Sequence, residues 1–189
     1  MKHPRIAIAA LSLSAAGFVG LVSHEGFTDR ATIPVKGDRP TVGFGSTFRD
    51  DGAPVQMGDT ITAPKAVARS FNHIAKDESR LKQCVTAPLT QHEYDTLVNH
   101  AYQYGAYVTC QSTVVRLTNE GRYAEACQAY LKFKYITAPV SYGQGWEPFK
   151  FDPDGKPTRY RFDCTTPGNK TCAGVGQRSL ARVKTCMGG

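Results

Sequence analysis

Residues 25 to 45 read EGFTDRATIPVKGDRPTVGFG, and a carboxylate stands first in this stretch. Two segments with the composition of short strands follow it, Ile33 to Val35 and Thr41 to Phe44. Residues 36–38 between them are typical of a turn, so we expect a hairpin that brings Asp38 and Thr41 back toward Glu25. Hydrolysis of a glycoside needs one carboxyl group to protonate the leaving oxygen and a second group to handle water. The stretch therefore predicts a glycosidase site.

The residues before Glu25 support this prediction. Phe18, Leu21, Val22 and Glu25 are spaced for one face of a continuous helix. An apolar surrounding favours the neutral form of a carboxyl group, which is the form that a general acid needs. Taken without the following hairpin, Glu25 is equally well read as an ordinary charge at the end of a helix.

The N-terminus has the composition of a weak membrane element. Lys2 and Arg5 precede Ile6 to Val22, a run without charges that is rich in Ala, Gly and Ser. Its length lies at the short end of the range for a membrane-spanning helix. We consider three interpretations of residues 1–22: a cleaved signal peptide, a marginal anchor that later leaves the inner membrane, and a buried helix of a cytoplasmic protein. The first two predict export, either secreted or tethered to the inner membrane and then periplasmic.

Length and charge limit the remaining possibilities. The chain has 189 residues, 41% of them hydrophobic, which suits one globular domain over residues 23–189. The net charge of +7 favours an anionic polymer as partner, either nucleic acid or a bacterial envelope. The sequence contains no basic block with interleaved aromatic residues, so nucleic acid is not expected. We expect a monomer without cofactor or metal.

Helices are predicted for much of the remainder. Thr90 to Glu93 form a capping box before an apolar stripe, and Thr62 with Pro64 marks an earlier helix start. Further helices are expected at 113–119, 122–133 and 175–186. With the short hairpin, this pattern predicts a mainly helical α+β domain.

Residues 141–173 lack helical periodicity. The turn sequence Asp152-Pro153-Asp154-Gly155 is flanked by aromatic residues, so we expect an inserted β-hairpin arm. The chain has six cysteines, and with export they favour disulfides. Cys164 and Cys172 are the best candidate pair, whereas buried free thiols are the alternative.

Several segments together resemble phage-type lysozymes, glycoside hydrolase family 24. The matching segments are Glu25-Gly26-Phe27, Thr41 to Gly45, Pro88 to Leu97, Tyr104-Gly105-Ala106, Ser112 to Leu117, Gly121-Arg122-Tyr123 and Gly176-Gln177-Arg178. The resemblance implies an α+β lysozyme-like fold and cleavage of the β-1,4 bond between N-acetylmuramic acid and N-acetylglucosamine in peptidoglycan. The weak apolar start resembles that of signal-anchor-release endolysins, which are held inactive at the membrane until the host membrane potential collapses.

The chain departs from the family pattern at the second carboxylate. That pattern places Asp nine positions after Glu and Thr six positions later, whereas Pro34 occupies the ninth position here. We predict that Asp38 supplies the second carboxylate of the site, and Asp29 is the alternative residue. Glu25 would protonate the glycosidic oxygen, Asp38 would position or deprotonate water, and Thr41 would hold that water. Two alternatives stay open: a lytic transglycosylase acting on the same bond, and a non-catalytic peptidoglycan-binding protein.

Overall fold

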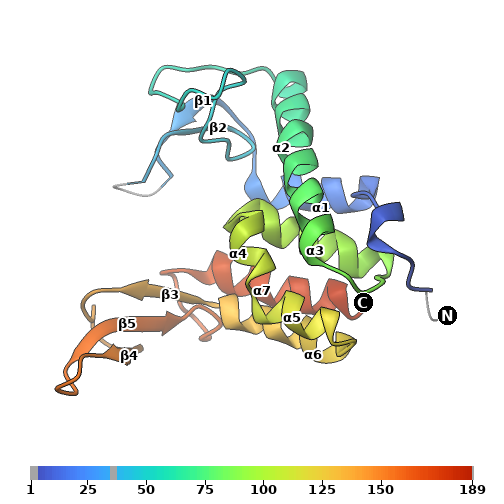
Figure 1. Ribbon diagram of the computed structural model, residues 1–189. Coiled ribbons are helices and arrows are strands. Elements are labelled where there is room, and N and C mark those ends of the chain that lie inside the picture. The colour runs from blue at the N-terminus through green and yellow to red at the C-terminus, as the bar shows by residue number, and fades with distance from the viewer. Residues whose placement is uncertain (1–3, 35–37, 189) are drawn as a thin grey trace.

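Helices form the body of the molecule, and two small sheets project from one side of it in the computed structural model (Figure 1). The structure describes residues 4–34 and 38–188, without the side chain of His24. The helices are η1 Ile8–Ala10, α1 Ala15–Glu25, α2 Ala63–Cys84, α3 Gln91–Tyr104, α4 Ala106–Cys110, α5 Thr113–Asn119, α6 Tyr123–Gln128, η2 Ala129–Phe133 and α7 Ala173–Cys186. The strands are β1 Thr28–Thr32, β2 Thr41–Gly43, β3 Tyr135–Ala138, β4 Trp146–Phe151 and β5 Pro157–Asp163. This architecture confirms the predicted α+β class.

The sheet β1–β2 belongs to a small lobe with its own apolar core. The two strands are antiparallel, with Thr28 opposite Gly43 and Thr32 opposite Thr41. The core of this lobe is a cluster of buried residues to which the strands contribute Ala31 and Val42. The other members are Val55, Ile61 and Ala66. The hairpin prediction is thus confirmed, but the first strand lies earlier than residues 33–35. Burial of Ala31 fixes the strand there, whereas Ile33 and Pro34 are exposed; Val35 and the predicted turn at 36–37 lie outside the described residues.

Helix α2 connects the small lobe to the helical body. It spans 22 residues and begins after Thr62 with a proline in its first turn, as predicted. Ala66 near its start packs in the small lobe, while Ile74 and Leu81 are buried in the main core. One continuous helix therefore fixes the distance between the lobes.

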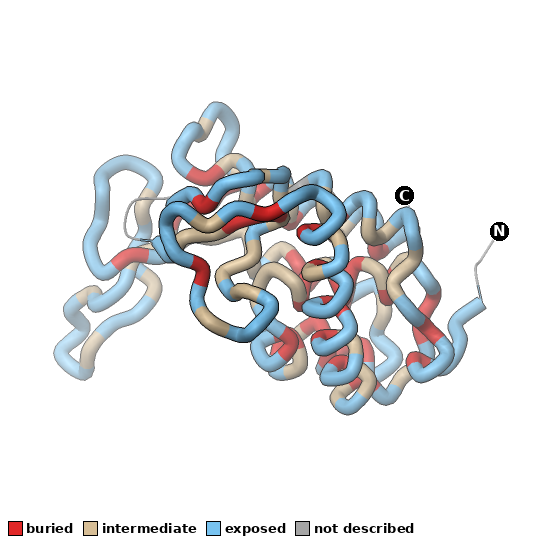
Figure 2. The backbone as a smooth tube through the Cα atoms, turned by 90° about the horizontal axis from the view of Figure 1, so that it is seen from above, coloured by how far each residue is buried: buried red, intermediate tan, exposed pale blue. Residues whose placement is uncertain are grey.

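Helix α3 is the centre of the body. The capping box is present, because the Thr90 hydroxyl accepts from the Glu93 amide and the Glu93 carboxylate accepts from the Thr90 amide. Tyr94 and Val98 have no exposed surface. In Figure 2 the buried positions concentrate in the helical body, whereas the loops and strands projecting from it are mostly exposed. Gly105, with a φ of 85°, ends the helix as predicted.

The N-terminal segment is packed onto this body. Ile8 and Leu11 are buried in the main core, and the Ile6 amide and carbonyl pair with Leu89. Arg5 forms an ion pair with the buried Glu93 at 2.6 Å. The segment is broken into η1, an extended stretch and α1, and across residues 4–34 and 38–188 no helix is both long and apolar enough to cross a bilayer. The predicted boundary at residue 22 falls within α1 and stays a prediction.

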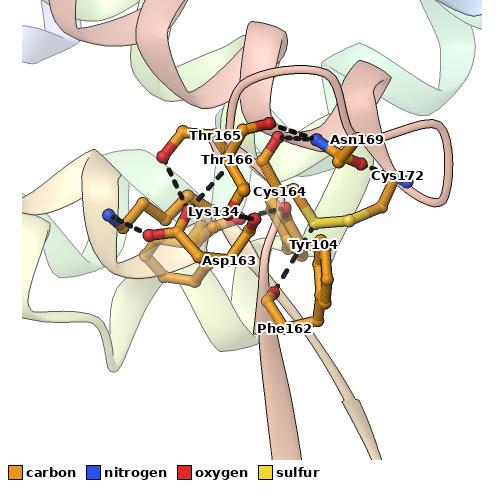
Figure 3. The surroundings of a disulfide bond; sticks show 10 residues. Tyr104, Lys134, Phe162, Asp163, Cys164, Thr165, Thr166, Asn169 and Cys172 are labelled. Carbon is orange, nitrogen blue, oxygen red and sulfur yellow. Dashed lines mark hydrogen bonds and ion pairs between the residues drawn. A yellow bond between two sulfur atoms is a disulfide. The ribbon is translucent and has the colours of Figure 1, made fainter. Parts of the chain in front are cut away.

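The expected arm is the β4–β5 hairpin, which pairs with β3 to form a sheet of order β3-β5-β4. At its base the Cys164–Cys172 disulfide is present, as predicted (Figure 3). An ion pair between Lys134 and Asp163 at 2.6 Å also lies there. The base packs on α7, where Gly176 touches the Cys164 carbonyl so closely that a β-carbon would not fit. This contact explains a glycine at that position.

Two further disulfides join elements of the body. Cys84–Cys110 links the end of α2 to the end of α4, and Cys127–Cys186 links α6 to α7. All six cysteines are therefore paired, and the alternative of free thiols is wrong. Both linkages tie helices that are distant in sequence.

Candidate active site

Glu25 is the last residue of α1 and lies where the helical body meets the small lobe. Phe18 and Val22 pack against the main core and Leu21 is buried within it, so the predicted apolar face of this helix is confirmed. The Glu25 residue itself is half-buried. Gly26 follows with a φ of 71°, a conformation that lets the chain leave the helix and enter β1. The carboxylate is thus held at the edge of the apolar core.

The turn after β2 meets this carboxylate. Gly43 and Gly45 both have positive φ, near 71° and 74°. A β-carbon on Gly45 would lie 3.2 Å from Oε2 of Glu25, and one on Gly43 would lie 3.0 Å from the β-carbon of Ala66. The glycines of Thr-Val-Gly-Phe-Gly therefore allow the backbone to approach Glu25 on one side and α2 on the other.

Tyr102 of α3 joins the turn to the body. Its hydroxyl donates to the Phe44 carbonyl at 2.7 Å and lies 3.4 Å from the Ser70 hydroxyl. Burial raises the pKa of Tyr102, and the negative charge of Glu25 acts in the same direction. The phenol therefore stays protonated beside Glu25. Tyr102 is not among the predicted site residues, because its bond joins it to a residue 58 positions away in the sequence.

A cleft of about 540 Å³ opens from this point between the turn and the helices α2 and α3. Gly45, Tyr102 and Gln103 are among the residues that line it. His73 also lines it, packs edge-on against the Tyr102 ring at 5.1 Å and lies 3.3 Å from the buried Asp77. Gly45, whose backbone approaches the Glu25 carboxylate, places this cleft next to the end of α1.

Thr41 and Asp38 lie on the segment that leads into this turn. Thr41 is half-buried on β2, and its hydroxyl reaches the Thr32 carbonyl at 3.5 Å. Asp38 is exposed and accepts from the Arg39 amide at 3.2 Å. In the described part of the chain no hydrogen bond or ion pair joins Glu25 to either residue. The structure thus brings Glu25 to the strand that carries Thr41, without direct contact between the side chains.

Asp29, the rival second carboxylate, lies on β1. The helix α1 ends at Glu25, so Asp29 does not continue the face that carries Glu25. Asp29 is exposed, and its backbone carbonyl accepts a hydrogen bond from the Ile61 amide at 2.9 Å. Asp29 is therefore held by the small lobe rather than by α1.

Comparison with known proteins identifies the family. The phage lysozyme family model matches residues 22–145. The endolysin of Salmonella phage P22 is 32% identical over 124 residues, which is 66% of this chain and 84% of that protein. An endolysin from Acyrthosiphon pisum secondary endosymbiont phage 1 is 28% identical over 123 residues, covering 65% and 80% of the two chains. The hairpin β4–β5 lies beyond the matched residues.

Solved structures share the fold. The endolysin from Escherichia coli O157:H7 phage FAHEc1 superposes with a TM-score of 0.72 at 22% identity, covering 95% of each chain. The muramidase domain of SpmX from Asticaccaulis excentricus gives a TM-score of 0.68 at 23% identity, covering 94% of this chain and 99% of that one. The predicted lysozyme-like fold is confirmed, and this chain belongs to the phage lysozyme family.

Proposed function

We propose that this protein is an endolysin that hydrolyses the β-1,4 bond between N-acetylmuramic acid and N-acetylglucosamine in bacterial peptidoglycan and thereby lyses the host cell. The observation that carries the proposal is the position of Glu25. A half-buried carboxyl group ends an apolar helix and meets a glycine turn, and Gly45 of that turn also lines a cleft. Membership of the phage lysozyme family supports the same reaction.

In this mechanism Glu25 is the general acid. It donates its proton to the glycosidic oxygen as the bond to the sugar breaks. Tyr102 would keep the turn in place against the carboxyl group through its bond to Phe44. The acid is thus held at a fixed position relative to the substrate.

Water would attack from the side of the hairpin. In an inverting glycosidase the two carboxyl groups stand about 6.5–9.5 Å apart, which leaves room for that water. We propose Asp38 as the group that activates it and Thr41 as the group that holds it. The absence of a direct bond from Glu25 to Asp38 or Thr41 in the described structure is compatible with an intervening water. Asp29 is the alternative base.

Substitution of Glu25 tests the acid. Glu25→Gln keeps the shape and removes the proton donor, so we expect lysis of permeabilised cells to fall by about 10²–10⁴-fold. Glu125→Gln is the matched control, because Glu125 is exposed on α6 and pairs only with Arg122 among described residues. Circular dichroism must show both variants folded. Full lytic activity of Glu25→Gln would refute the assignment.

The second carboxylate is tested by two parallel variants. We expect Asp38→Asn to lose most activity and Asp29→Asn to retain it, and the reverse result would transfer the role to Asp29. Mass spectrometry of the digested wall should show reducing muramic acid ends. Anhydro-muramic ends would instead indicate a lytic transglycosylase, and wall binding without any cleavage would indicate a non-catalytic protein.

We also propose that the enzyme is exported and that residues 1–22 tether it to the inner membrane before it acts in the periplasm. The uncharged run from Ile6 to Val22 supports a membrane-bound stage. Ile8, Leu11 and Leu21 are buried in the folded domain, so the same segment must leave the bilayer to complete the core. Fractionation of expressing cells, before and after collapse of the membrane potential, should show a shift from membrane to soluble fraction. An intact mass lacking the N-terminus would instead indicate a cleaved signal peptide.

A further inference from the structure

A second cavity, of about 310 Å³, lies between α1, α3 and α7. Much of its wall is apolar and small, formed by Ala16, Gly20 and Leu21 of α1 and by Ala181 of α7. A β-carbon added to Gly20 would meet no atom within 4 Å. The small residues of α1 therefore leave space beside this helix that the neighbouring helices do not fill.

Two arginines of α7 line the same cavity. Arg182 is only 5% exposed, and it donates through Nε to Asn99 at 2.8 Å and through Nη2 to Gln103. Its Nη1 is buried without a partner, and so is Nε of Arg178. Within residues 4–34 and 38–188, no carboxylate forms an ion pair with either side chain. The cavity is thus lined by two arginine side chains that have no carboxylate partner in the described protein.

The electrostatics of this wall are unusual for a protein interior. Burial lowers the pKa of Arg182, and the neighbouring Arg178 acts in the same direction, yet a guanidinium stays charged at neutral pH. A buried charge without a counterion is costly. Asp95 lines the cavity too, but its oxygens already accept from Ser14 and from Gln91. An external anion in the cavity would supply the counter-charge that Arg178 and Arg182 lack.

We propose that this cavity binds a small organic oxyanion with a short apolar chain. The anionic group would lie between Arg178 and Arg182, whose planar donors suit a carboxylate or phosphate. The apolar chain would lie along Gly20 and Leu21. The site is separate from the substrate cleft, although Gln103 accepts from Arg182 and also lines that cleft. Binding stabilises the packing of α1 on the body.

Thermal unfolding with n-butyl phosphate as the probe tests the proposal. We expect a saturable rise in Tm, because a ligand that binds only the folded state stabilises it. Inorganic phosphate, which lacks the chain, should give a smaller rise at equal concentration. Sodium chloride at matched ionic strength should give none. Equal effects of all three salts would overturn the proposal.

Variants locate the binding site. Arg178→Gln should lose most of the rise caused by butyl phosphate, whereas Lys184→Gln should keep it, since Lys184 is exposed on the same helix and carries the same charge. Gly20→Leu should fill the apolar end and remove the advantage of butyl phosphate over inorganic phosphate. An unchanged response in both Arg178→Gln and Gly20→Leu would refute the site. These readouts do not depend on lytic activity.

Discussion

Removal of single disulfides should destabilise the protein in the order of the loops that they close. Cys127–Cys186 closes a separation of 59 residues, Cys84–Cys110 one of 26 and Cys164–Cys172 one of 8. The chain-entropy relation gives about 4, 3.5 and 2.5 kcal/mol respectively. The first and last differ further in surroundings, because Cys127 and Cys186 are buried in the main core whereas Cys164 and Cys172 belong to the small cluster of the arm.

Double Cys→Ala variants, unfolded in guanidinium chloride, measure this order. The only tryptophan, Trp146, lies on β4, so its fluorescence follows the arm while far-ultraviolet circular dichroism follows the helices. We expect loss of Cys127–Cys186 to move both transitions to lower denaturant. Loss of Cys164–Cys172 should move the fluorescence transition more than the helical one.

Reduction of the unmodified protein breaks all three disulfides and is the control. It should lower the free energy of unfolding more than any variant that lacks a single disulfide. A loss of stability from Cys164→Ala/Cys172→Ala equal to that from Cys127→Ala/Cys186→Ala would refute the loop-length reasoning.

Three further predictions concern single side chains. Gly20→Ala should stabilise the protein by up to about 1 kcal/mol, because it improves a helix interior where nothing obstructs the new methyl group; a lower Tm would show that the space is needed. Burial acts to raise the pKa of Asp163, but bonds from Lys134 and Thr165 outweigh it and hold the pKa below its usual value of 3.8. The stability that Asp163 contributes is therefore present above pH 3.8 and lost as the pH falls through its folded pKa, and Asp163→Asn should remove this acid dependence of the Trp146 transition. Burial, with a smaller effect of Arg182, lowers the pKa of His100 from 6.5 to about 3. The unfolded chain therefore binds one more proton between these values, and stability should fall by about 1.4 kcal/mol per pH unit below pH 6.5; protonation of the folded His100 ring near pH 6.5, seen by NMR, would contradict this.

Features set by local sequence were predictable. The capping box at Thr90 and Glu93 depends on residues within one turn of helix, and its geometry is as expected. The arm was recognisable from its turn sequence, and Cys164–Cys172 from its short spacing. The apolar face of α1 followed from helical periodicity. In each case the residues that determine the structure are close neighbours in the chain.

Features that depend on packing between distant segments were not predictable. The strand β1 was placed too late, because the burial of Ala31 against Val55 and Ile61 cannot be read from residues 28–35 alone. No local pattern singles out Tyr102 on α3, and only the folded chain shows its bond to Phe44, 58 residues away.

The burial of the two arginines of the cavity also depends on distant segments and could not be predicted from the sequence. Arg178 and Arg182 lie one turn apart on α7, a spacing that by itself indicates an ordinary solvated helix face. Arg182 is nevertheless almost fully buried, because α3 supplies Asn99 and Gln103 as partners for two of its donor groups. Those partners are uncharged, so they satisfy hydrogen bonds without neutralising the guanidinium. A residue's need for a counterion therefore depends on which neutral groups surround it, and that information exists only in the tertiary structure.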